Sequence, residues 1–89
     1  MADQNAFINE VLGRVEDDYE VPHTIAGDLS RDLGRDVTEP EVLEALLSLA
    51  ESGLIQSYLY DRDTSRFVPV AFDGKVAHES LWFMAVKQT

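Results

Sequence analysis

The sequence contains no cysteine, one tryptophan and only seven lysine and arginine residues among its 89 positions. Without cysteine, the chain has neither a disulfide framework nor thiolate chemistry. No apolar run approaches the ~20 residues that a membrane-spanning helix needs. The first residues, MADQNAFINE, lack the basic and apolar segments of a secretory signal. These absences lead us to expect a cytoplasmic protein without a membrane segment.

Residue patterns typical of catalysis or of metal binding are also scarce. His23 and His78 are the only histidines, and neither has a second ligand at the short spacings that metal sites use. The pair Asp61 and Asp63 is not followed by the glycine and the glutamate of a calcium loop. We therefore expect no enzymatic activity, no cofactor and no metal ion.

The net charge of -10 is distributed unevenly along the chain. Acids outnumber bases by nine to three in residues 1–37 and by four to none in residues 38–53, whereas residues 54–89 hold four of each. No repeat, low-complexity tract or linker divides the sequence, so we expect one domain spanning residues 1–89. A chain of this length buries about 60–65% of its unfolded surface and can fold without disulfides or a structural metal ion.

The clearest local pattern lies in residues 38–55, TEPEVLEALLSLAESGLI. Thr38 and Glu41 have the spacing of a capping box, and Gly53 is suited to the left-handed conformation that ends a helix. The apolar positions recur at spacings of three and four: Val42, Leu43, Leu46, Leu47, Leu49 and Ala50. The opposite side carries Glu41, Glu44, Ser48, Glu51 and Ser52. This pattern predicts an amphipathic helix that leads into a strand.

Two further helices are expected before this one. The first covers about residues 3–17, with Asp3 as its N-cap, and the second begins at His23 or Thr24 and ends at Gly34. Only a short connection separates Gly34 from Thr38, which is typical of a helix-turn-helix corner.

From Leu54 onward the period of the pattern changes to two, which predicts strands. Residues 54–60 and 66–72 form a hairpin around the polar turn DRDTS, and residues 80–87 form a third strand that is apolar on both faces. Pro69 cannot donate a hydrogen bond, so its strand is expected at a sheet edge or at a bulge. The fold class predicted is α+β.

The order of elements, with T-E-x-E-V-x-x-A-L-x-x-L-x-x-x-G-L-I leading into the hairpin, resembles the winged-helix fold of small bacterial transcriptional regulators. The most specific matching residues are Val42, Ala45, Leu46, Leu49, Gly53, Leu54 and Ile55. The resemblance implies a three-helix bundle with a helix-turn-helix corner, followed by a small antiparallel sheet made of a wing hairpin and a C-terminal strand. Winged helices serve as DNA readers, as protein-interaction modules and as dimerisation units, so the resemblance leaves the function open.

DNA binding requires cations, because DNA carries one charge every ~1.7 Å and Lys and Arg displace its counterions. A third helix that presents Glu41, Glu44 and Glu51 without any base would be repelled. The alternative function is a DNA-binding regulator that contacts DNA through the wing and the second helix, by means of Arg31, Arg35, Arg62 and Arg66. The simpler interpretation is that these arginines, with Lys75 and Lys87, are scattered or pair with nearby aspartates.

The strands contain more aromatic residues than a sheet covered on one face requires. If Ile55 and Leu59 face the helices, Tyr58 and Tyr60 point away, and they can form a patch with Trp82 and with Val68 or Phe67. The first helix or the amino terminus can also cover these side chains, and the sequence leaves that open. Our main hypothesis is a module that acts through protein–protein contacts, as a homodimer or as a subunit of a regulatory assembly. The residues expected to contact a partner are Tyr58, Tyr60 and Trp82, with Glu41, Glu44 and Ser48 as a second surface for a basic protein.

Overall fold

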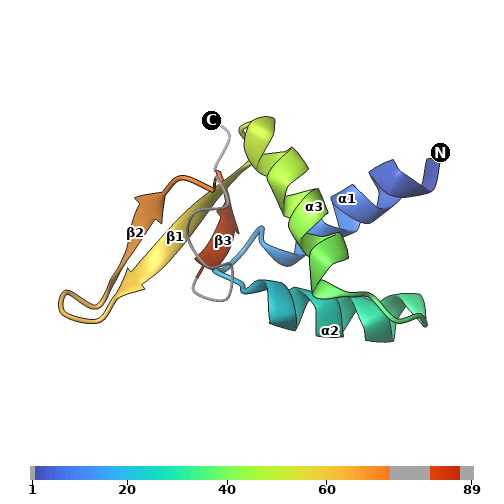
Figure 1. Cartoon of the computed structure of the whole chain (residues 1–89), viewed down its shortest axis with the longest axis horizontal. Coiled ribbons are helices and arrows are strands. Elements are labelled where there is room, and N and C mark those ends of the chain that lie inside the picture. The colour runs from blue at the N-terminus through green and yellow to red at the C-terminus, as the bar shows by residue number, and fades with distance from the viewer. Residues whose placement is uncertain (1, 73–80, 87–89) are drawn as a thin grey trace.

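The computed structural model describes residues 2–72 and 81–86, which form three helices and a small three-stranded antiparallel sheet (Figure 1). The elements are α1 (Ala2–Arg14), α2 (Pro22–Leu33), α3 (Glu39–Glu51), β1 (Ile55–Asp61), β2 (Arg66–Val70) and β3 (Leu81–Ala85). The predicted α+β class is confirmed. Within the described part of the chain, no helix is long and apolar enough to cross a membrane.

The start of α3 is fixed by the predicted capping box. The hydroxyl of Thr38 accepts a hydrogen bond from the backbone N–H of Glu41, and the backbone N–H of Thr38 donates to the carboxylate of Glu41 at 3.2 Å. Both glycines expected at helix ends adopt the left-handed conformation, with φ of 67° at Gly34 and 76° at Gly53. These local predictions are confirmed.

The predicted N-caps of the other two helices are wrong. α1 begins at Ala2 and ends at Arg14, so Asp3 lies inside the helix and cannot be its N-cap. α2 begins at Pro22, whose fixed φ and missing N–H suit the first helical position, so His23 lies within the first turn. The cap position belongs to Val21, which makes no side-chain cap hydrogen bond.

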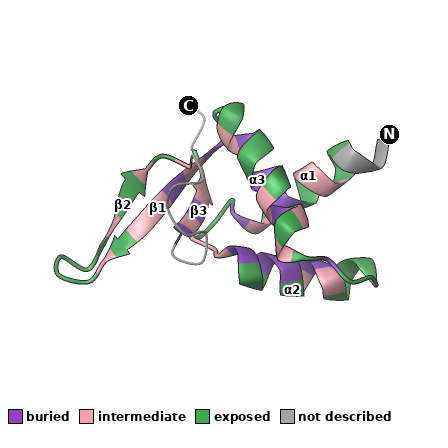
Figure 2. Cartoon of the chain, in the orientation of Figure 1, coloured by how far each residue is buried: buried purple, intermediate pink, exposed green. Residues whose placement is uncertain are grey.

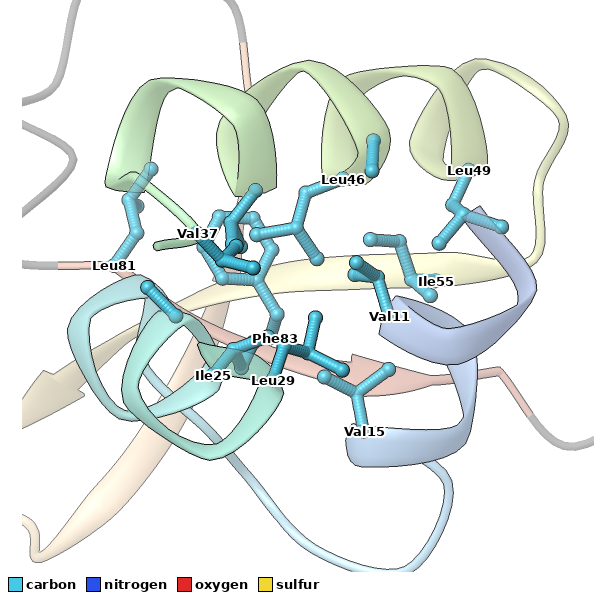
Figure 3. Close-up of a cluster of buried hydrophobic side chains, with 13 residues drawn as sticks. Val11, Val15, Ile25, Leu29, Val37, Leu46, Leu49, Ile55, Leu81 and Phe83 are labelled. Atoms are coloured by element: carbon cyan, nitrogen blue, oxygen red, sulfur yellow. The ribbon is translucent and has the colours of Figure 1, made fainter. Parts of the chain in front are cut away.

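The hydrophobic core lies where the three helices meet one face of the sheet (Figures 2 and 3). Its fully buried side chains come from all three helices, β3 and neighbouring loops, and Phe83 is the largest of them. The apolar stripe predicted for α3 was too wide, because Leu47 remains 41% exposed on the outer side of the helix. Val37 was not predicted to be in the core. It is held there because the Ser30 hydroxyl accepts its backbone N–H at 2.9 Å.

The sheet has the strand order β2-β1-β3, with both pairings antiparallel. Glu20, between α1 and α2, pairs with Phe83 through two backbone hydrogen bonds of 2.8 and 2.9 Å and so borders the other side of β3. Pro69 lies in the edge strand β2, as predicted. The ends predicted for the third strand, Ser80 and Lys87, fall outside the described residues.

Candidate functional site

The side of the sheet that points away from the helices is aromatic. Strand alternation places Ile55, Ser57 and Leu59 on the helix-facing side of β1 and sends Tyr58 and Tyr60 to the outer side. The cross-strand register adds further outward side chains, so that the outer side carries Gln56, Tyr58, Tyr60, Phe67, Pro69, Trp82 and Met84. None of these seven side chains is charged.

The outward rings touch one another. Phe67 lies edge-on to Tyr60 and to Trp82, with ring centres 5.1 and 5.4 Å apart. Of the two β2 residues considered from the sequence, Phe67 therefore joins the patch, whereas Val68 pairs with Leu59 on the opposite side of the sheet. The predicted contact residues Tyr58, Tyr60 and Trp82 are thus brought together.

Tyr19 was not predicted to belong to this patch. Its ring stacks on Phe67 with centres 3.8 Å apart and planes 9° from parallel, and it lies edge-on to Tyr58 at 5.0 Å. We call Tyr19, Tyr58, Tyr60, Phe67 and Trp82 the aromatic face. The segment between α1 and α2 covers part of this surface, whereas the sequence had suggested the first helix or the amino terminus as the cover.

Tyr19 reaches the sheet because its neighbour Glu20 is bound to β3. The backbone pairing of Glu20 with Phe83 fixes the segment against the strand, and the Asp18 carboxylate accepts the Tyr19 backbone N–H at 2.7 Å. Burial, together with the charges of Asp28 and Asp18, raises the pKa of Glu20. The only sequence signal for this arrangement is the extended Val21-Pro22 pair that follows, because the surrounding acids are typical of a solvated helix end.

Partial burial affects the chemistry of the rings. Burial, followed by the neighbouring Tyr19, raises the pKa of Tyr58 above its usual value. Tyr60 remains 44% exposed, while Phe67 and Trp82 are half-buried. The aromatic face is therefore uncharged at neutral pH and still accessible.

A second surface lies between α1 and α3. Glu41, Glu44 and Ser48, predicted from the sequence to contact a partner, all line an open groove of about 300 Å³. Its other lining residues are Phe7, Ile8, Arg35 and Ala45. We call this hollow the α1–α3 groove. Its apolar part comes mostly from α1 and its acidic part from α3.

Arg35 is one of the lining residues of the groove. Its guanidinium donates to the Glu41 carboxylate at 3.1 Å and lies over the Phe7 ring, 5.5 Å from the ring centre. The backbone N–H of Thr38 and then Arg35 lower the pKa of Glu41. This carboxylate is therefore ionised, and the ion pair with Arg35 balances its charge. Glu44 is exposed and forms no ion pair with any of the described residues.

The arginines of the DNA-binding alternative do not form one positive surface. Arg31 pairs with Asp28 at 2.6 Å and Arg35 pairs with Glu41, both near the end of α2. Arg62 and Arg66 lie at the β1–β2 turn, and Figure 1 shows that turn and the end of α2 at opposite ends of the long axis. Lys75 and Lys87 are outside the described residues.

No arrangement of ligands for a metal ion occurs within residues 5–72 and 81–86. His23 is exposed in the first turn of α2, with Nδ1 3.9 Å from a carboxylate oxygen of Glu39, and no third ligand joins the pair. His78 lies outside the described residues.

Comparison with known proteins returned no matching family model, no matching curated protein and no matching solved structure. The two surfaces are therefore interpreted from their own geometry and charge.

Proposed function

We propose that the chain is a non-enzymatic winged-helix module that acts through protein–protein contacts. The winged-helix assignment is supported by the element order, by the short connection between Gly34 and Thr38, and by the residues of α3 that carry the resemblance. The partner that fits best is a second copy of the chain, docked through the aromatic face. A different subunit of a regulatory assembly is the other partner in this class.

One observation carries the proposal: five aromatic side chains gather on an uncharged side of the sheet that the helices leave open. Two copies with a formal net charge of -10 each repel one another over an acidic surface. An uncharged face allows them to approach with the least repulsion. Tyr, Trp and Phe are also the residues enriched at the centres of protein interfaces.

The size of the aromatic face limits the strength of the dimer. Three strands at about 4.8 Å spacing, each with five paired residues at about 3.4 Å, span roughly 250 Å². A stable interface buries about 800 Å² per partner, so this face alone supports a weak dimer. We therefore expect dimers only at high protein concentration.

Light scattering behind a sizing column tests the proposal. The mass of the wild-type chain should rise with concentration, and Tyr58→Ser, Tyr60→Ser and Trp82→Ser should each return it to the monomer value. Leu47→Ser is the matched control, because Leu47 is 41% exposed and Tyr60 44%, yet Leu47 lies on α3. A wild-type monomer at every concentration, or a Leu47→Ser variant that also loses the dimer, contradicts the proposal.

DNA binding through the wing and α2 is the weaker proposal. Arg62 and Arg66 at the turn favour it, but Arg31 and Arg35 are already paired with carboxylates, and the two groups are far apart along the molecule (Figure 1). Titration of a DNA duplex of mixed sequence with the chain at low salt should show no binding. Binding that fades steeply with salt and is lost in an Arg62→Ala, Arg66→Ala double variant supports DNA binding instead.

A further inference from the structure

We infer that the α1–α3 groove binds a basic side chain, Lys or Arg, from a segment of a partner protein. This site does not depend on the proposed self-association, because the groove is built by helices and the aromatic face by the sheet. The inference rests on the size of the groove, on its charge and on the position of Arg35.

The volume of the groove suits one side chain. At about 300 Å³ it lies at the lower limit of sites that hold small-molecule ligands, and it is partly open to solvent. Phe7 and Ile8 of α1 and the buried Ala45 of α3 supply its apolar lining. Lys and Arg side chains lay their aliphatic stems along such a surface while the charged group stays in water.

Among the described residues, the lining of the groove carries two carboxylates and one cation. Glu41 and Arg35 neutralise one another, which leaves Glu44 as the carboxylate without an ion-pair partner among the described residues. Ser48, one helical turn further along α3, adds a hydroxyl that can accept a hydrogen bond. α3 has no basic residue, and Arg35, the cation in the lining, is already paired with Glu41.

Arg35 shows within the same chain how such a side chain is held. Its guanidinium lies over an aromatic ring of α1 and bonds to a carboxylate of α3. A partner's basic side chain in the groove would meet the same two elements, with Ile8 and Ala45 beneath its stem and Glu44 at its charged end. A bound basic side chain would therefore repeat the contacts with α1 and α3 that Arg35 already makes.

The experiment uses a labelled amphipathic peptide of lysine and leucine, with a second peptide in which every lysine is replaced by glutamate. Titration of the full chain with the lysine peptide, followed by amide NMR shifts, should move the signals of Phe7, Ile8, Glu44 and Ser48. The glutamate peptide should not bind. If it binds equally well, or if the shifts lie on the sheet, the groove is not a site for a basic side chain.

Two variants with the same change of charge distinguish binding in the groove from attraction of the peptide to the overall negative charge of the chain. Glu44 and Glu51 are both exposed on α3, but only Glu44 lines the groove. Glu44→Gln should weaken binding of the lysine peptide about three- to fivefold, and Glu51→Gln by less than about 1.5-fold. Equal losses from both variants overturn the inference. Glu44→Gln should leave the molar mass measured by light scattering, and so the self-association, unchanged. Failure of the groove site and failure of the self-association are thereby distinguished.

Discussion

Replacing Tyr19 by Ala tests whether the segment between α1 and α2 is held to the sheet by its ring. The substitution removes a parallel stack on Phe67, with ring centres 3.8 Å apart, and an edge-on contact with Tyr58 at 5.0 Å. Each such pair contributes about 0.5–1.5 kcal/mol beyond the area that it buries. The two together predict a loss of about 2 kcal/mol in the free energy of unfolding.

A loss of this size is large for a domain of 89 residues. Small domains are stable by about 5–15 kcal/mol, and 1 kcal/mol shifts the melting temperature of such a chain by about 4–8 °C. Tyr19→Ala should therefore melt about 8–16 °C below the wild type. Thermal unfolding followed by circular dichroism, with a urea titration as a second measurement, gives both quantities.

Two control variants make this result specific. Tyr19→Phe keeps the ring and should melt as the wild type does. Tyr60→Ala removes one edge-on contact, with Phe67 at 5.1 Å, and should cost only about 0.5–1 kcal/mol. The reasoning is refuted if Tyr19→Ala melts within about 2 °C of the wild type, or if Tyr19→Phe loses as much stability as Tyr19→Ala.

Four further predictions concern backbone conformation and pH. Gly13 lies within α1 with open space at its Cβ position, so Gly13→Ala should stabilise the chain by about 0.5–1 kcal/mol in urea titrations. Gly34 has a φ of 67°, so Gly34→Ala should destabilise the chain by about 1–2 kcal/mol. The pKa of Glu20 is raised by folding, so its contribution to stability is complete below the unfolded value of about 4.5 and is lost as pH rises through the folded pKa. Glu20→Gln should therefore melt above the wild type at pH 7 and equal to it at acid pH. The pKa of Glu41 is lowered, so Glu41→Gln should melt below the wild type at pH 7, with the difference vanishing as pH falls through the folded pKa. Folding also raises the pKa of Tyr58, so Tyr58→Phe should remove from the absorbance titration a tyrosine whose midpoint lies above the usual value.

Features set by neighbours in the sequence were predictable. The capping box of Thr38 and Glu41 needs residues three positions apart, and the left-handed glycines follow from the chemistry of helix ends. Pro69 could be assigned to an edge strand because it has no N–H to donate. The start of α2 was misplaced because polar residues were favoured as the cap over the preference of proline for the first helical position.

Features set by distant parts of the chain were not predictable. Tyr19 joins the aromatic face only because Glu20 pairs with β3, more than sixty residues later in the chain. In the same way, helical spacing predicted that Glu41, Glu44 and Ser48 share one side of α3, but the apolar lining of the groove depends on how α1 packs against that helix. Arg35 was considered as a DNA contact, and the fold instead places it against Glu41 and an aromatic ring.

The most direct test of the proposed function is an isotope-filtered NOE measurement on an equal mixture of labelled and unlabelled chain, at a concentration where the mass has begun to rise. The account predicts intermolecular cross-peaks between the ring protons of Tyr60 and Trp82 in one copy and the aromatic face of the other. Cross-peaks that arise only from α1 and α3, or a dimer without any contact between aromatic rings, would contradict it.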